Sequence, residues 1–331
     1  MHIMSAFEYS FLAGELSRSL VGKHLSRIRK IGEKRYRMKI GSDEVICELG
    51  MRINITRYIE PCEGGDKFAE KIEKELGNAR LKAVRQVCHD RILSFDFEKG
   101  SLIFEMFGEG NAILIRDGAI IAAHRYETWS DREIKAGSPY KAPKTSPSEA
   151  LELSDKYVIV SLMKMPLGKE YALEAISRSG IDEKTPGTSL NPEQRQNLEK
   201  AIDEMLTSAR PTGFFEGGRM ADFSLARLSK LSKSEPRDFA TLSEAADEYY
   251  ANAEKPNLKL EKLLGRLEKQ KERIAALKEE EKELKAKGDL IYERYSRVEE
   301  LSALAKSGDF GSLEKQNVKI DKKGKTLEAD L

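Results

Sequence analysis

Basic side chains alternate with apolar ones in two neighbouring segments, a pattern that could bind phosphate groups. The cations concerned are Arg27, Arg29, Arg35, Arg37 and Lys39. In an extended strand, such alternation puts the charges on one face and the apolar residues on the other. A hairpin at Gly32 would join the two segments into one basic stripe, and each phosphate bound there would release counterions. The alternative is a solvated face whose charges meet acidic side chains, although the run from 23 to 39 contains a single acidic residue.

Asp90 and Arg91 form a second candidate, immediately before a strand expected at 92–97. An arginine can hold a phosphate or a base edge through two hydrogen bonds, and an aspartate can accept one from an amino group or a ribose hydroxyl. The alternative is an ordinary turn aspartate beside a surface arginine.

Glu8 lies three residues after Ser5, at the start of an expected helix. This is the spacing of a capping box, in which each side chain accepts a hydrogen bond from the backbone of the other. A carboxylate near a helix start could also approach Arg91 or a bound RNA. The residues alone favour the capping role.

The segment from 166 to 206 is similar to a helix-hairpin-helix arrangement, with Lys169 near the start of its first helix. Such units present backbone amides and helix N-termini to phosphates. A small helical packing module is an equally good interpretation, and the residues do not decide between the two.

The sequence contains no recognisable catalytic constellation. The glycines at 108 and 110 lack a third glycine and fall between two expected strands, so they predict a hairpin turn rather than a nucleotide-binding loop. The three cysteines have no C-x-x-C spacing, and with four scattered histidines they predict no zinc site. We therefore expect a binding protein that is not an enzyme and uses no metal or cofactor.

An antiparallel, β-rich α+β domain is expected over residues 1–147. Apolar residues recur every three or four positions between Phe7 and Leu20, which predicts an amphipathic helix. Alternation within 92–97 predicts a strand with one buried face. Short strands bounded by turn residues are expected at 27–31, 35–40, 44–49, 81–87, 92–97, 101–107, 112–116 and 119–123, with a helix at 68–76.

Helical patterns dominate the rest of the chain. A helical domain is expected over residues 148–256, with helices at 170–179, at 191–206 and at 241–250. Leucine, isoleucine and valine then recur at intervals of seven among lysine and glutamate, which is typical of a coiled coil. The arm at 257–331 is expected to hold one helix over 258–306, about 70 Å long, with a bend near Glu281 and Gly288. Its apolar seam needs a partner helix, so self-association through the seam stays open, and the arm is interpreted as truncated.

Composition sets broader bounds. The 331 residues are 40% hydrophobic and 34% charged, which predicts a globular protein of two or three domains. The formal net charge of +1 does not by itself point to a nucleic-acid partner. No apolar segment is long enough for a membrane span or a signal peptide, so the sequence predicts a cytoplasmic protein.

Several segments, taken together and in order, resemble the NEMF/RqcH (NFACT) family of ribosome-quality-control factors. Each segment alone is weakly specific, but the ordered set covers nearly the whole chain. The segments are the initial helix with Gly22, residues 48–53, Phe68, and residues 90–92, 107–111, 132–143, 168–172 and 288–292.

The resemblance implies a factor that binds tRNA and a large ribosomal subunit carrying stalled peptidyl-tRNA. It also implies support of template-free C-terminal tailing of the nascent chain, with the chemistry left to the ribosome. The family's tRNA-engaging Asp-Arg pair matches Asp90 and Arg91, and Arg52 is carried over from a matching strand. The family's acidic residue in the first helix is aspartate, whereas Glu8 stands at that position here. The sequence is interpreted as an N-terminal fragment without the family's later NFACT-R domain.

The family's N-terminal region is itself similar to formamidopyrimidine-DNA glycosylases, so a DNA-repair-like protein is one alternative. The glycosylases' N-terminal Pro-Glu and their zinc finger are missing from this sequence, which argues against base excision. A surface adhesin or structural scaffold is the other alternative. Glycosylase activity on a lesion-containing duplex would support the first alternative. Tight binding to an extracellular matrix protein, without binding to any RNA, would favour the second.

Overall fold

The computed structural model describes residues 2–62, 64–144, 147–148, 150–252, 258–316, 318–321 and 326–329. The chain divides into two compact units, Met1–Ala253 and Glu254–Leu331, each treated separately below. The predicted boundary between 256 and 257 lies outside the described residues.

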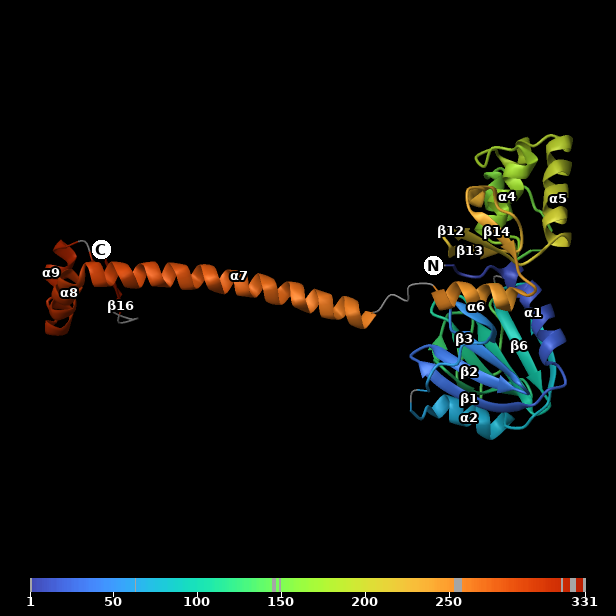
Figure 1. The fold of residues 1–331 in the computed structure, drawn as a ribbon, viewed down its shortest axis with the longest axis horizontal. Coiled ribbons are helices and arrows are strands. Elements are labelled where there is room, and N and C mark those ends of the chain that lie inside the picture. Colours follow the sequence, from blue (N-terminus) through green and yellow to red (C-terminus); the bar gives the residue numbers. More distant parts are fainter. Residues whose placement is uncertain are drawn as a thin grey trace. The chain divides into compact units, whose positions relative to one another are not determined.

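Figure 1 shows the elements of both units. In the first unit they are α1 (Ala6–Leu20), β1 (Leu25–Gly32), β2 (Arg35–Ile40), β3 (Asp43–Glu48), β4 (Arg52–Thr56), α2 (Lys67–Leu76), β5 (Leu81–Gln86), β6 (Ile92–Phe97), β7 (Gly100–Glu105), β8 (Asn111–Arg116), β9 (Ala119–Ala123), β10 (Glu127–Thr128), β11 (Glu133–Ile134), α3 (Val158–Leu162), α4 (Lys169–Ser179), α5 (Pro192–Thr207), β12 (Thr212–Glu216), β13 (Arg219–Ser224), β14 (Glu235–Asp238) and α6 (Leu242–Asn252).

Two antiparallel meanders form the β-rich part of this unit. Strands β1 to β4 make one sheet and strands β5 to β9 make the other, each in sequence order. Helix α1 packs on both sheets, and α2 packs on β1 and β9. The mixed helix and antiparallel-sheet architecture agrees with the predicted α+β class.

One hydrophobic core runs through the β-rich part and the helical part that follows it. It includes Leu12 and Leu16 of α1, Phe95 of β6, Tyr171 of α4 and Tyr250 of α6. The core is therefore continuous across the predicted boundary at residue 147, because α1 supplies apolar side chains to both sides.

Strand β6 departs from its predicted pattern of one buried face. Leu93 and Phe95 enter the main core, whereas Ile92 joins a second apolar cluster with Ile103 and Ile113. Both faces of the second sheet are thus covered, and the covering residues include Ile134 of β11 with Phe107 and Tyr140 of neighbouring loops, which alternation within β6 could not reveal.

The region predicted to be helical also contains a three-stranded sheet in the order β13-β12-β14. This sheet corrects the expectation of a purely helical domain over 148–256. The turn between β12 and β13 holds Gly217 and Gly218, both at positive φ, which is a recognisable hairpin signal. Helices α4 and α5 begin and end close to their predicted bounds and pack against each other, while their assignment as a helix-hairpin-helix stays a prediction.

The second unit contains α7 (Leu258–Glu293), α8 (Tyr295–Ser307), α9 (Phe310–Lys315), β15 (Lys319–Asp321) and β16 (Thr326–Glu328). The predicted single helix over 258–306 is interrupted at Arg294, not at Glu281 or Gly288. Beyond the break, Leu301, Leu313 and Val318 form a small cluster that holds α8 against α9. Within the described part of the chain, no helix is both long and apolar enough to cross a membrane.

Candidate nucleic-acid interface

A cavity of about 660 Å³ lies at the start of α1. Its wall is formed by the first residues of the chain, the start of α4, strand β13 and the loop before β6. The predicted contacts Glu8, Arg91 and Lys169 all line it. The fold therefore brings together three side chains that are far apart in the sequence.

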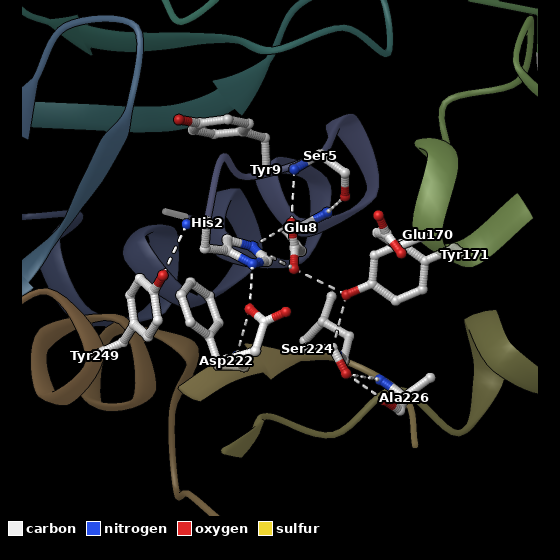
Figure 2. Close-up of polar contacts among 12 residues, drawn as sticks. His2, Ser5, Glu8, Tyr9, Glu170, Tyr171, Asp222, Ser224, Ala226 and Tyr249 are labelled. Carbon is white, nitrogen blue, oxygen red and sulfur yellow. Dashed lines mark hydrogen bonds and ion pairs between the residues drawn. The ribbon is translucent and has the colours of Figure 1, made fainter. Parts of the chain in front are cut away.

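Glu8 is the central acidic group of this cavity and is only 1% exposed. Its Oε2 accepts a hydrogen bond from the Ser5 N–H at 2.6 Å, and the Ser5 hydroxyl accepts one from the Glu8 N–H at 3.2 Å, so the predicted capping box is present. The Tyr171 hydroxyl donates to Oε1 at 2.9 Å (Figure 2). Glu8 therefore caps α1 and also joins it to α4, and its oxygens are already engaged within the protein.

His2 bridges two carboxylates in the same wall (Figure 2). One ring nitrogen lies 3.2 Å from Glu8 Oε1, and the other lies 2.7 Å from Asp222 Oδ1. Burial by itself lowers the pKa of the imidazole, but the two carboxylates outweigh burial and raise the pKa of His2 to about 10. The ring is therefore protonated at neutral pH and donates a hydrogen bond to each carboxylate.

The loop between β5 and β6 carries Asp90 and Arg91. Cys88 and His89 have φ angles of 55° and 51°, a conformation that residues other than glycine rarely adopt. The Asp90 carboxylate accepts a hydrogen bond from the Arg91 N–H at 2.7 Å. Asp90 therefore holds the backbone of the turn from which the Arg91 side chain extends.

Gln86 connects this loop to the start of α1. Its side-chain amide donates hydrogen bonds to the carbonyl oxygens of Ala6, at 2.7 Å, and Asp90, at 2.8 Å. The half-buried Arg91 side chain lines the cavity, and its guanidinium has no hydrogen bond or ion pair with any described residue. Hydrogen bonds thus hold the backbone of the loop, while the Arg91 guanidinium remains available to a ligand.

Helix α4 begins beside the cavity without a side-chain cap. Gly168 precedes it at a φ of 86°, and a Cβ at Gly168 would lie 2.6 Å from Cβ of Ser5, so the close approach requires glycine. The first N–H groups of a helix have no intrahelical partner and carry partial positive charge. Lys169 is exposed at this end, and within the described residues it makes no ion pair. Arg91, Lys169 and the helix N-terminus together could attract a phosphate.

Comparison with known proteins identifies the family. A family model described as the NFACT N-terminal and middle domains matches residues 10–328. The chain belongs to the NFACT family.

Its NFACT relatives include the archaeal Rqc2 homolog aRqcH of Methanocaldococcus jannaschii, which is 31% identical over 300 residues, covering 79% of this chain and 44% of that protein. Ribosome quality control complex subunit 2 of Saccharomyces cerevisiae is 34% identical over 149 residues, covering 42% of this chain and 14% of that protein. The chain therefore spans less than half the length of these relatives.

Among solved structures, the N-terminal part of the fibronectin/fibrinogen-binding protein from Streptococcus suis matches with a TM-score of 0.58 and 21% identity. The match covers 75% of this chain and 99% of that one. At this identity the likeness shows a shared fold and nothing about ligands.

Arg52, which the NFACT resemblance predicts to contact tRNA, is only 3% exposed. Its guanidinium carbon lies 4.6 Å from the centre of the Tyr250 ring, and its Nε lies 3.4 Å from Glu48 Oε2. Burial lowers the pKa of this guanidinium, against the opposing effect of Glu48. Arg52 therefore joins β4 to α6 and does not line the cavity, and its contact with tRNA stays a prediction.

The predicted basic hairpin of this NFACT chain forms, with Arg29 opposite Arg37 and Arg27 opposite Lys39. Its central charges are nevertheless neutralised by carboxylates from other elements. The ion pairs are Arg29–Glu73 at 2.7 Å, Arg37–Glu44 at 3.5 Å, Arg35–Glu48 at 3.7 Å and Arg35–Glu60. Arg27 and Lys39 are exposed cations without an ion pair among the described residues. Contact of this hairpin with the RNA backbone stays a prediction.

Sequence reasoning missed His2, Asp222 and Lys230, which also line the cavity. Asp222 lies on β13, a strand that was not predicted, and Lys230 pairs with Glu170 at 2.7 Å. Tyr171 fell within a family segment but had no assigned role. Recognising the glycine pair at 217–218 as a hairpin turn would have placed Asp222 on a strand, although not against His2.

Proposed function

We propose that this chain acts in ribosome quality control and binds tRNA at the cavity beside α1. The observation that carries the proposal is the unpaired Arg91 guanidinium next to exposed Lys169 and the uncapped start of α4. The similarity to an archaeal Rqc2 homolog and to yeast ribosome quality control complex subunit 2 supports the link to ribosome quality control.

Electrostatics favours a nucleic-acid backbone at this place. Each phosphate neutralised by a lysine or arginine releases condensed counterions, which is the main source of affinity for RNA. An arginine can also hold a phosphate through two hydrogen bonds. The hydrogen bonds of Glu8 with His2 and Tyr171 hold α1 beside α4. The two cations, Arg91 and Lys169, therefore face the same ligand.

The finer parts of the proposal follow from family membership. The natural ligand is tRNA on a large ribosomal subunit that carries stalled peptidyl-tRNA, and the factor supports template-free tailing of the nascent chain. Bond formation belongs to the ribosome, so the proposed role needs no catalytic group or cofactor in this chain. A cytoplasmic location follows from the ribosomal partner.

Binding of tRNA to single-residue variants tests the assigned site. Arg91→Ala and Lys169→Ala should each weaken tRNA binding by about 1–3 kcal/mol, because each removes a charged contact. Asp90→Ala should weaken it to a similar degree by releasing the turn, whereas Asp90→Asn, which keeps an acceptor oxygen for the Arg91 N–H, should bind nearly as the wild type does.

The charge-matched control is the pair Arg195→Ala and Lys200→Ala, since both residues are exposed on α5 and pair with glutamates one turn away. These variants should leave tRNA binding almost unchanged. Equal losses in the control and the cavity variants would mean that binding follows overall charge, and the assigned site would be wrong.

A further inference from the structure

A second cavity, of about 390 Å³, shares no lining residue with the first. It is built by two segments that the sequence singled out and that the tRNA proposal does not use, the turn at 107–111 and the stretch at 132–143. The turn is held in place by Gly110, at a φ of 71°, where a Cβ would lie 2.1 Å from the Gly50 nitrogen. The cavity therefore has a fixed wall at the turn that joins β7 to β8.

A buried ion pair supports the floor of this cavity. Both terminal nitrogens of Arg132 lie within hydrogen-bond distance of the Glu105 carboxylate, at 2.5 and 2.9 Å, and the Tyr140 hydroxyl donates to the same carboxylate at 3.0 Å. Arg132 is 9% exposed. Because the Glu105 carboxylate neutralises the charge of Arg132, the planar guanidinium has a fixed orientation.

Trp129 lies against that guanidinium. The Arg132 Cζ is 4.5 Å from the centre of the Trp129 ring, and the Trp129 N–H donates to the Arg132 carbonyl oxygen at 2.9 Å. The side chain nevertheless stays 41% exposed and lines the cavity. An indole that is supported on one side and open to a cavity is a ready surface for stacking another flat ring.

The charged residues that line the cavity indicate which kind of flat ring can bind there. Asp131 and Glu127 line the cavity. Arg125, which also lines it, pairs with Glu127 at 2.9 Å, whereas the Asp131 side chain makes no hydrogen bond or ion pair among the described residues. Asp131 therefore disfavours a phosphate inside the cavity. Carboxylates do accept hydrogen bonds from exocyclic amino groups of bases, such as the N4 amino group of cytosine. Exposed Lys144 also lines the cavity and can meet a phosphate that stays outside.

We propose that this second cavity binds a nucleobase with an exocyclic amino group, taken from an unpaired segment of RNA and stacked on Trp129. The assignment to RNA rests on the proposed function, since an RNA partner supplies the base. The base, rather than the backbone, provides recognition here, in contrast to the phosphate-directed cations of the first cavity.

The single tryptophan of the chain makes the test direct, because Trp129 fluorescence reports on this cavity alone. A cytidine pentanucleotide and a uridine pentanucleotide carry equal charge and differ at C4, where one has an amino group and the other a carbonyl. The cytidine oligomer should quench Trp129 saturably, and the uridine oligomer should bind at least about tenfold more weakly. Glu127→Gln together with Asp131→Asn should reduce this preference.

Binding of a dye-labelled cytidine pentanucleotide tests the stacking surface itself. Trp129→Ala should weaken binding by about 5- to 150-fold, as expected for loss of one base–aromatic stack, and Trp129→Phe should retain most of it. Tyr126→Ala is the matched control, because Tyr126 is an exposed aromatic residue nearby in sequence that does not line the cavity. Unchanged binding in Trp129→Ala would overturn the proposal.

Equal quenching by both oligomers, or quenching by a lysine-rich peptide and by neither oligomer, would also overturn it. The double variant Arg91→Ala/Lys169→Ala separates this inference from the proposed function. If that variant and the wild type both fail to bind tRNA but keep cytidine-dependent quenching, only the proposed function fails. If tRNA binding depends on Arg91 and no oligomer quenches Trp129, only this inference fails.

Discussion

At the residue scale, the carboxylate of Glu8 receives hydrogen bonds from Ser5, His2 and Tyr171, and these donors join the first residues of the chain to α4. His2 extends the network to Asp222 on β13. Its backbone N–H also donates to the Tyr249 hydroxyl at 2.9 Å. Buried hydrogen bonds therefore hold the wall of the first cavity, and those made by the His2 ring depend on its protonation.

The pH dependence of stability tests this dependence on His2. Because the folded-state pKa of His2 is raised from 6.5 to about 10, its contribution is complete below pH 6.5 and is lost as pH rises through about 10. The free energy of unfolding in urea should therefore fall between pH 6.5 and 10. His2→Gln should lower it by about 1.5–3 kcal/mol at pH 6, the value of hydrogen bonds to charged groups, and should flatten the decline.

The control for this measurement is His24→Gln, since His24 is exposed on the surface. This variant should keep the wild-type stability within about 0.5 kcal/mol at each pH. If wild type and His2→Gln lost stability in parallel across the window, the bridge between Glu8 and Asp222 would not be the source of the effect.

The residue scale also explains why the ion pairs of the basic run could not be predicted. Alternation placed Arg29, Arg35 and Arg37 correctly on strands, and the hairpin formed in the expected register. Their carboxylate partners, however, come from β3, α2 and the segment after β4. Pairing of charges across a tertiary fold leaves no signal in the local sequence, so the exposed charge could not be predicted.

At the element scale, helix α6 begins on a cap supplied by another helix. The Glu15 carboxylate of α1 accepts hydrogen bonds from the N–H groups of Leu242, at 2.7 Å, and Ser243, at 3.1 Å. Glu15 is buried, so these donors have no access to water as a substitute. Thr241 caps the helix locally, since its hydroxyl accepts a hydrogen bond from the Glu244 N–H at 3.1 Å. Glu15 therefore adds a second, long-range acceptor for the two N–H groups that precede Glu244.

Substitution of Glu15 tests this long-range cap. Glu15→Ala should lower the free energy of unfolding by about 2–4 kcal/mol, because two buried donors lose their acceptor. Glu15→Gln keeps one acceptor oxygen and should fall between this variant and the wild type. Glu199→Ala, at an exposed ion pair on α5, should change stability by less than about 0.5 kcal/mol in the same thermal or urea denaturation. A result for Glu15→Ala as small as that of the control would contradict the capping role.

Elements with strong periodicity or caps were predictable from the sequence. Helix α1 has its capping box, α5 begins at Asn191 and Pro192 as predicted, and β2, β6 and β9 lie where alternation put them. The sheet of β12 to β14 was missed because neither β12, which is buried at its first four positions, nor β14, which is exposed along its length, alternates between buried and exposed residues. The break at Arg294 was also missed, since packing of α8 on α9 decides it rather than the heptad pattern.

At the scale of the whole molecule, the apolar seam of α7 lies on the surface. Ile274, Leu277, Leu284 and Ile291 are all exposed, and Leu284 is 60% exposed. The side chains of Leu260 and Leu263, which begin the predicted seam, lie outside the described residues. The seam agrees with the expected need for a partner helix, and the proposed ribosomal partner and self-association both stay predictions.

Binding of tRNA at the first cavity through Arg91 and Lys169 can be tested with a salt series on the whole chain. The tRNA binding constant would be measured across salt concentrations for the wild type and for Arg91→Ala/Lys169→Ala, beside duplex DNA of equal charge. We expect preferential tRNA binding, a linear fall of log K with log salt, and a slope reduced by about 2 in the double variant. Equal binding of tRNA and DNA, or the same slope in both proteins, would contradict it.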